Sequence, residues 1–214
     1  ETAIDIHLVA TGSSSTSFSA PSSDGTATNG TNNATFTKAT EVEFGYDASS
    51  GLSWGRWQGS WTATDAVHGN VTATANDNLH WFATSTQKQT ISLPVTGTWS
   101  YVKVGNTSPT DDAGNVGVLN SAAFSANFTN QTITTSVNVT VATKTFNATS
   151  ANIQILKGGS FKDSAPVITC TPTCGTTAGI MNGQFSQNGA GVGVSYGLKQ
   201  GTQKVHGVVV FKHH

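Results

Sequence analysis

Apolar and polar residues alternate along most of this chain, and this pattern limits the folds open to it more than any other feature. Side chains of a β-strand point alternately to its two faces, so a period of two gives one buried and one wet face. Residues with high helix propensity are sparse, and apolar residues rarely recur at helical spacing. The clearest alternating runs are Val137-Asn-Val-Thr-Val141, Asn152-Ile-Gln-Ile155, Val192-Gly-Val-Ser-Tyr196 and Val208-Val-Val-Phe211. The pattern predicts an all-β protein.

Turn-forming residues divide the chain into short segments of similar length. Breaks occur at 47–51, 68–70, 111–115, 157–159 and 199–201, where Gly, Asn and Asp cluster. We expect strands over 2–10, 41–47, 53–65, 78–85, 97–104, 117–128, 132–142, 146–157, 179–187, 190–198 and 203–212. Regular spacing of this kind is typical of a β-meander, either closed as a barrel or folded as a sandwich.

Charged residues are scarce. The 214 residues include 10 Lys and Arg and 11 Asp and Glu, giving a net charge of −1. Such a chain has no positive field to attract nucleic acid or an anionic membrane, and little material for acid–base catalysis. A closed barrel would remove the open strand edges that a surface with few charges protects poorly. No apolar run is long enough to predict a membrane-spanning helix.

The N-terminus differs from the rest. The stretch 2–10 alternates cleanly, with Ile4, Ile6 and Leu8 on one face and Asp5 and His7 on the other. A single strand cannot satisfy its own backbone hydrogen bonds, so this segment must join a sheet. That sheet is either its own or that of a neighbouring molecule. We therefore expect three parts: an N-terminal strand (1–11), a Ser/Thr/Asn/Gly-rich linker (12–40) and a β-barrel domain (41–214).

Two cysteines, Cys170 and Cys174, lie four residues apart. A zinc site would need a second pair of ligands, and no compact pair is present in the sequence. We therefore expect a disulfide across this short loop, which places the protein in an oxidising compartment, outside the cell or on its surface. Eight sequons match the glycosylation acceptor pattern, but a chain rich in Asn and Thr produces them by chance, and glycosylation is left open.

Several segments follow one another in the order of a known bacterial pattern. They are Gly51-Leu-Ser-Trp-Gly-Arg-Trp57, Leu79-His-Trp-Phe82, Leu93-Pro-Val-Thr-Gly-Thr-Trp-Ser-Tyr101, Ser108–Gly114 and Phe124–Phe128. This part resembles the barrel domains of secreted proteins that carry a FecR domain. The closing part, with Gly183-Gln-Phe185, Gly189, Tyr196, Gly207 and Phe211, is similar to the transferrin-binding-protein-B-like eight-stranded barrel. Gln187 departs from that pattern, which has Gly there. The resemblance implies a secreted or surface protein that folds as a single antiparallel up-and-down β-barrel of about eight strands, and it maps no ligand-reading residues.

Aromatic residues offer one candidate ligand platform. It would comprise Trp54, Arg56, Trp57, Trp61 and Trp81, because aromatic faces stack on sugars and an arginine stacks on aromatic rings. Trp57 and Trp61 are four residues apart, so they share a strand face, whereas Trp54 lies on the other. The alternative, which we favour, is that these large rings fill the barrel or its ends.

Other candidate sites are weaker. His80 and His206 lie in expected strands and were weighed as axial haem ligands, although structural histidines are more common. The loop around Asp111, Asp112 and Asn115 supplies too few oxygens for calcium. We expect no enzyme activity, no cofactor and no metal.

Three functions fit these observations. The first is a structural subunit of an extracellular fibre, a homopolymer in which Ile4, Ile6 and Leu8 insert into the next subunit. The second is a surface binding module for a host protein, haem or glycan. The third is an adhesin or sensor fragment of a longer FecR-domain protein. The first is placed narrowly ahead, with no nucleic-acid partner and no membrane span.

Overall fold

The computed structural model describes residues 25–29, 32–36, 40–59, 62–65, 69–72, 78–84, 91–172 and 174–214. Within these ranges every regular element is a β-strand except one short 3₁₀ turn, η1 (Gln187–Gly189), so the all-β prediction is confirmed. The described part contains no helix of sufficient length and apolarity to cross a membrane. The predicted N-terminal strand, with Ile4, Ile6 and Leu8, and Trp61 lie outside the described residues.

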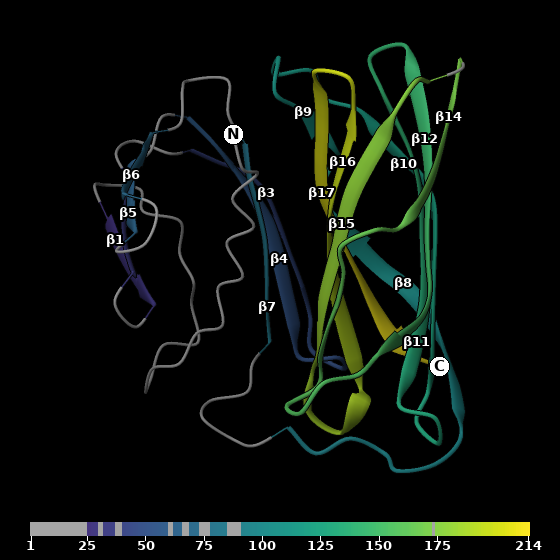
Figure 1. The fold of residues 1–214 in the computed structure, drawn as a ribbon. Coiled ribbons are helices and arrows are strands. Elements are labelled where there is room, and N and C mark those ends of the chain that lie inside the picture. Colours follow the sequence, from purple (N-terminus) through teal and green to yellow (C-terminus); the bar gives the residue numbers. More distant parts are fainter. Residues whose placement is uncertain are drawn as a thin grey trace.

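Ten of the described strands form one large antiparallel sheet, which curls around a common core (Figure 1). Its strand order is β13-β15-β16-β17-β8-β10-β11-β12-β14, with β9 added to β17. Consecutive strands pair in two runs, β10-β11-β12 and β15-β16-β17, as expected for an up-and-down arrangement, whereas β9, β13 and β14 pair with strands that are not their neighbours in the chain. The strands are β8 (Thr98–Asn106), β9 (Thr110–Asp111), β10 (Val118–Asn127), β11 (Thr132–Val141), β12 (Lys144–Gln154), β13 (Ser160–Asp163), β14 (Val167–Thr171), β15 (Thr177–Phe185), β16 (Gly191–Gln200) and β17 (Gln203–His213).

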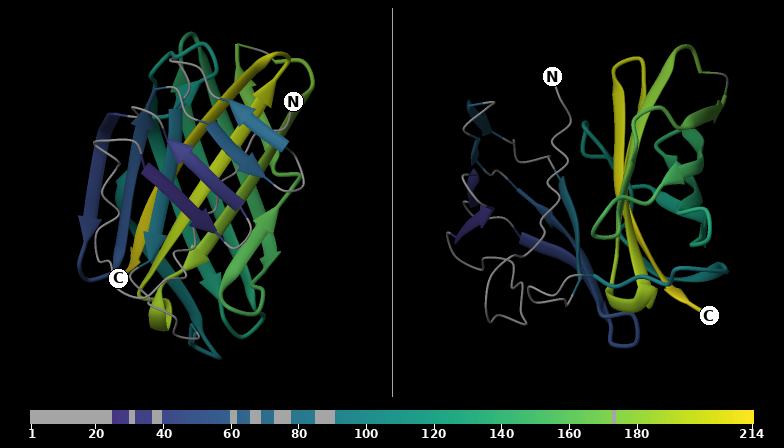
Figure 2. Two further views of the ribbon diagram at one scale, coloured as in Figure 1. Left: turned by 90° about the vertical axis from the view of Figure 1, so that its left-hand side faces the viewer. Right: turned by 60° about the horizontal axis from the view of Figure 1, so that its bottom comes forward.

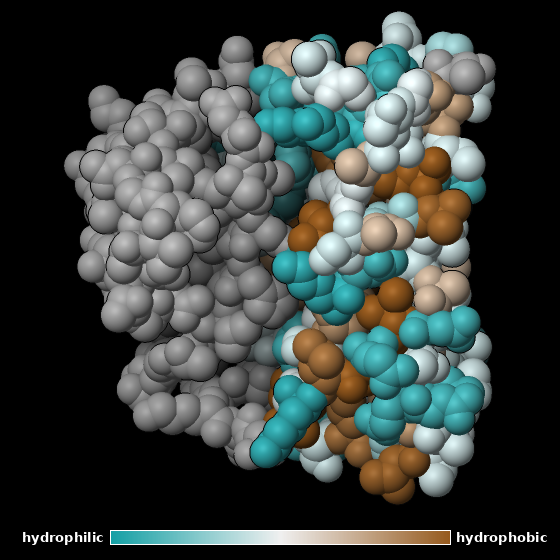
Figure 3. Space-filling view, viewed as in Figure 1, coloured by the Kyte–Doolittle hydropathy of each residue, from teal (hydrophilic) through white to brown (hydrophobic). Residues whose placement is uncertain are grey.

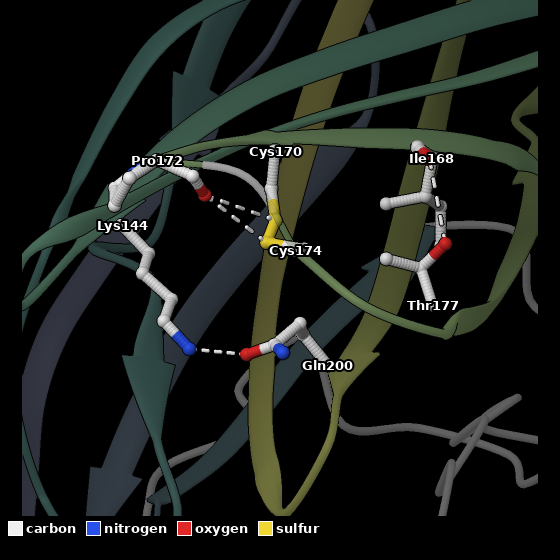
Figure 4. Close-up of a disulfide and its surroundings, with 7 residues drawn as sticks. All are labelled: Lys144, Ile168, Cys170, Pro172, Cys174, Thr177 and Gln200. Carbon is white, nitrogen blue, oxygen red and sulfur yellow. Dashed lines mark hydrogen bonds between the residues drawn. A yellow bond between two sulfur atoms is a disulfide. The ribbon is translucent and has the colours of Figure 1, made fainter.

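β14, one edge strand of the large sheet, lies beside residues 177–180 of β15, the part of that strand that β13 does not pair with, and we call this place the seam (Figure 4). No backbone ladder joins these two strands, but the Thr177 hydroxyl donates to the Ile168 carbonyl at 3.4 Å. Nearby, Lys144 Nζ donates to Gln200 Oε1 between two hairpin ends. Cys170 and Cys174 form the predicted disulfide, which closes the loop between β14 and β15. One side-chain hydrogen bond and the short connection that carries the disulfide therefore join β14 to β15 at the seam.

The inside of the large sheet is filled by side chains. Alternation explains it directly: on β11, Ile133, Val137 and Val139 are buried, whereas Asn138 between them is not. Phe185 is fully buried, and its ring contacts those of four other aromatic residues, Tyr101, Phe124, Phe128 and Phe161. This interior is a packed core.

Three strands that we expected inside the barrel form a separate small sheet. It has the order β3-β4-β7, with β3 (Thr40–Asp47), β4 (Leu52–Gln58) and β7 (Asn78–Thr84). A third sheet has the order β1-β2-β5-β6, with β1 (Gly25–Asn29), β2 (Asn32–Phe36), β5 (Thr62–Asp65) and β6 (Gly69–Thr72). The single strand expected over 53–65 is thus two strands in two sheets, and the expected linker contains β1 and β2. The three sheets lie in layers, with the small sheet in the middle (Figures 1 and 2).

The small sheet packs against the outer side of β16, β17 and β8. Val208 and Val210 of β17 point away from the barrel core and pack against Leu52 and Phe82 of the small sheet. Glycine allows this approach, since a Cβ at Gly193 would collide with the Phe82 ring. The run Val208–Phe211 is therefore apolar on both faces because both are buried, the first in this interface and the second in the core.

Candidate functional site

The small sheet has two faces with different chemistry. Its inner face, toward the large sheet, carries Glu43, Trp54, Arg56, His80 and Phe82, which strand pairing places side by side. Its outer face carries Phe44, Tyr46, Trp57 and Trp81. These two faces contain the functional residues that the sequence singled out in this region.

The predicted aromatic platform does not form one surface in the described residues. Trp54 and Arg56 lie on the inner face, whereas Trp57 and Trp81 lie on the outer one. Trp57 and Trp81 pack against each other, with ring centroids 5.8 Å apart, and are only 2% and 3% exposed. Buried rings offer no open face to a sugar. These two tryptophans therefore match the packing role that the sequence analysis favoured.

Arg56, the only arginine of the chain, makes a buried ion pair on the inner face. Its Nη2 donates to Glu43 Oε1 at 3.0 Å, and its Nη1 donates to Asn78 Oδ1 at 2.6 Å. The other Glu43 oxygen accepts the Ser108 backbone N–H at 2.8 Å, which ties the small sheet to the large one. Burial raises the pKa of Glu43, but the hydrogen bonds from Arg56 and Ser108 outweigh it and leave the pKa below its ordinary value. Arg56 thus forms an ionic bridge on the inner face, and the cation–π contact considered for it stays a prediction.

His80 forms a second polar bridge between the two sheets. Its Nδ1 lies 2.7 Å from Thr107 Oγ1 and its Nε2 lies 2.8 Å from Thr110 Oγ1. Thr107 Oγ1 also accepts the Val208 N–H, so its own proton is available for His80 Nδ1. A neutral ring with the proton on Nε2 satisfies all these partners. Both ring nitrogens are engaged, which argues against the haem-ligand alternative for His80.

We expect stability to fall in mild acid because of His80. Burial, and next the charges of His206 and Arg56, lower the pKa of His80 well below its ordinary value. Below about pH 6.5 the unfolded chain therefore binds a proton at His80 that the folded protein does not bind. The free energy of unfolding should drop by up to about 1.4 kcal/mol per pH unit below that point and stay flat above it. Urea titrations between pH 7.5 and 5.5 measure this slope. His80→Gln should flatten it, and an equal slope in both proteins would assign it to other groups.

The acidic loop is a hydrogen-bonded turn. Asp111 accepts the backbone N–H groups of Ala113 and Asn115 and the side-chain amides of Asn115 and Gln203, at 2.9 to 3.1 Å. These bonds occupy its carboxylate. In the described ranges no group of three or more His, Cys, Asp or Glu residues is placed to hold a metal ion.

β3 presents the apolar surface that the sequence analysis did not identify. Phe44 and Tyr46 are 60% and 59% exposed on the outer face, and Val42, beside a bulge, is 39% exposed. Among the described strands β3 pairs only with β4, and no described strand lies along its other edge. Other exposed apolar residues lie on the large sheet and its loops, where hydrophilic residues are interspersed (Figure 3). The alternation of Val42, Phe44 and Tyr46 predicts a strand here, but alternation alone does not show which face of that strand is buried.

No protein-family model matches the sequence. No curated protein matches it either. Among solved structures, that of intact Ap-TbpB (N and C lobes) matches with a TM-score of 0.44 and 11% sequence identity, over 89% of this chain. The match spans 37% of the Ap-TbpB chain. The resemblance to FecR-associated barrels stays a prediction.

Proposed function

We propose that this protein is a non-enzymatic extracellular binding module that holds an extended segment of a partner protein along β3. The observation that carries the proposal is the edge of β3 that no described strand occupies, beside two aromatic side chains that are 60% and 59% exposed. An open edge binds a strand through backbone hydrogen bonds, and alternate side chains select its sequence. Exposed apolar clusters of this kind commonly mark interaction sites.

The inner face supports the module by holding β3 in place. Glu43, on β3 itself, is fixed by Arg56 of β4 and by Ser108 of the large sheet. Because its carboxylate points inward, it does not guard the outer face against a partner as charges on edge strands often do. Glu43 and His80 are hydrogen-bonded in the inner-face bridges, and Asp111 is hydrogen-bonded in its own turn, which supports a structural role for these three groups.

An extracellular or surface location is part of the proposal. The disulfide between Cys170 and Cys174 suits an oxidising compartment, and its loop lies beside the seam of the large sheet. The resemblance to secreted bacterial barrels agrees with this location.

A peptide library tests the binding surface. Peptides selected on the native protein should be extended, with apolar residues at alternate positions, because a β3 partner would present one face to Phe44 and Tyr46. Replacing Phe44 and Tyr46 with serine should weaken binding of a selected peptide at least tenfold in a fluorescence titration. Val167→Ser is the matched control, since Val167 is 72% exposed on a different strand, β14. Equal loss in the control, or no loss in the double variant, would contradict the proposal.

Glycan and haem remain the competing ligands of a binding module. A glycan array and a haem titration followed at the Soret band test them directly. Saturable binding of either that is insensitive to the Phe44 and Tyr46 substitutions would place the binding site elsewhere.

A second candidate is the fibre subunit, for which the partner segment comes from another copy of the chain. The favouring observation is again the open β3 edge, which can accept a strand such as 2–10. Head-to-tail donation gives open filaments, because the contact does not close on itself.

Light scattering on the full chain tests this assembly and should show polymers. The double substitution Ile4→Asp with Ile6→Asp should leave folded monomers. Asp5→Asn, on the opposite face of the segment, is the control and should still polymerise. Monomers of the unmodified chain would rule out assembly.

A further inference from the structure

We propose that β3 receives residues 2–10 of a neighbouring copy in antiparallel orientation, with Ile6 opposite Phe44. The proposal rests on the fibre assembly described above and specifies its receiving site. It follows from three observations: where the described sheets are open, which open edge is apolar, and which orientation brings opposite charges together.

The seam of the large sheet has no space for another strand. An inserted strand needs about 4.8 Å on each side, so its neighbours must stand about 10 Å apart. Ile168 of β14 instead packs directly on β15: its Cδ1 would lie 2.6 Å from a Cβ placed at Gly179, and its carbonyl accepts the Thr177 hydroxyl. Insertion here would require β14 and β15 to separate.

The two edges of the small sheet differ in what they leave exposed. β7 forms one edge, but its outer-face residues Leu79 and Trp81 are already 5% and 3% exposed. β3 forms the other edge, and its outer-face residues Phe44 and Tyr46 remain open to solvent. A strand added at β3 would cover them, whereas one added at β7 would find its neighbours covered. Burial of apolar area therefore favours β3.

The alternation of the segment 2–10 matches that of β3. With Ile6 opposite Phe44 in an antiparallel pair, Ile4 falls opposite Tyr46 on the same outer face. Leu8 then falls toward the exposed Val42. Pairs of an aromatic with a β-branched residue are among the favourable cross-strand combinations. Each partner has one apolar face, and the two faces coincide.

Charge distinguishes the antiparallel orientation from the parallel one. In the antiparallel register His7 lies opposite Glu43, and Asp5 lies opposite Gly45. In a parallel register with the same central pair, Asp5 would lie beside Glu43. The hydrogen bonds of Glu43 to Arg56 and Ser108 favour its ionised form, and like charges directly opposite are unfavourable. The antiparallel orientation places a histidine, a potential cation, beside that carboxylate.

A synthetic peptide of sequence Thr2–Ala10 tests the receiving site. It is titrated into the full chain carrying Ile4→Asp and Ile6→Asp, which disables the chain's own donor segment and leaves β3 unchanged. We expect saturable binding that weakens more than tenfold when Phe44→Asp and Tyr46→Asp are added. Val167→Asp is the control and should leave binding unchanged. Circular dichroism and thermal unfolding confirm that each variant is folded.

The outcomes separate this inference from the assembly on which it rests. Peptide binding that survives the Phe44 and Tyr46 substitutions would show donation at another edge and overturn β3 as the receiver. Failure of the peptide to bind any variant would overturn strand donation itself.

Peptide variants test the orientation. His7→Glu should weaken binding about two- to fivefold, because it places like charges opposite each other in the antiparallel register. Asp5→Asn should have little effect, because Asp5 faces Gly45. Tighter binding of Asp5→Asn with no change for His7→Glu would indicate the parallel register and overturn the proposed one.

Mixing full-length variants tests donation between molecules. Chains with Ile4→Asp and Ile6→Asp can only receive, and chains with Phe44→Asp and Tyr46→Asp can only donate. Each should be monomeric alone, and an equimolar mixture should form dimers that grow no further. A mixture that stays monomeric would overturn donation between neighbouring copies at β3.

Discussion

Replacing Phe185 with alanine is expected to lower the free energy of unfolding by about 3–5 kcal/mol, the usual cost of removing a buried aromatic ring. Phe185 is fully buried at the centre of an aromatic cluster, and its ring centroid lies 5.7 Å from those of both Phe124 and Phe128. β15, which carries Phe185, pairs with β13 on one side and with β16 on the other. The backbone therefore cannot move far enough to fill the cavity that the substitution leaves.

Urea unfolding followed by tryptophan fluorescence measures this loss. Phe185→Leu keeps most of the volume and should lose much less stability. Val95→Ala, at a position that is 79% exposed, is the control and should change stability by less than about 0.5 kcal/mol. A small effect of Phe185→Ala would mean that the core is looser than its burial indicates.

Replacing Glu43 with alanine is expected to cost about 3 kcal/mol, the lower end of the range for breaking a buried pair. Arg56 is 6% exposed, so it would keep a buried charge with only the Asn78 amide as a described partner at its terminal nitrogens. We place the value at the lower end because Glu43 itself is 25% exposed and contributes less to the buried environment.

A double variant tests the cause of that loss. Glu43→Ala with Arg56→Met removes both charges, so it should be more stable than Glu43→Ala alone. Lys103→Met is the control, because Lys103 bonds Asn106 on the exposed surface and should contribute little. A double variant that is less stable than Glu43→Ala would show that Arg56 acts chiefly through packing. Hydrogen exchange should show the largest loss of protection in β3 and β4.

The strands with one polar and one apolar face could be predicted closely. β11, expected at 132–142, spans Thr132–Val141, and β16, expected at 190–198, spans Gly191–Gln200. Local alternation is sufficient here because each strand pairs with its chain neighbours. β14 was not predicted, since it is short and follows Pro166.

The division into separate sheets could not be predicted, because it depends on contacts distant in sequence. The apolar run Val208–Phe211 was interpreted as one buried face, although it signals burial on both faces. Recognising that signal would have required a second layer outside the barrel. In the expected linker, Asn29 of β1 pairs with Asn32 of β2, and the prediction made no use of the Asn29-Gly30 turn signal between them.

The candidate site was predicted only in part. The alternation of side chains along a strand correctly placed Trp54 and Trp57 on opposite faces, but it could not show which face would pack against the large sheet. The partner of Arg56 was not foreseeable, because the bulge between Glu41 and Glu43 sets the register that brings Glu43 opposite it. The open edge of β3 likewise depends on which strands fail to pair with it.

The position of β17 has a consequence for how the molecule is made. β17 supplies Val208 and Val210 to the interface with the small sheet, and Phe211 to the core of the large one. During synthesis the small-sheet strands emerge long before the surface on which they pack. Neither Leu52 nor Phe82 can reach its final environment until β17 has been translated. Pairings this distant in sequence form slowly, so the small sheet should reach its final packing only after the rest of the chain has been synthesised.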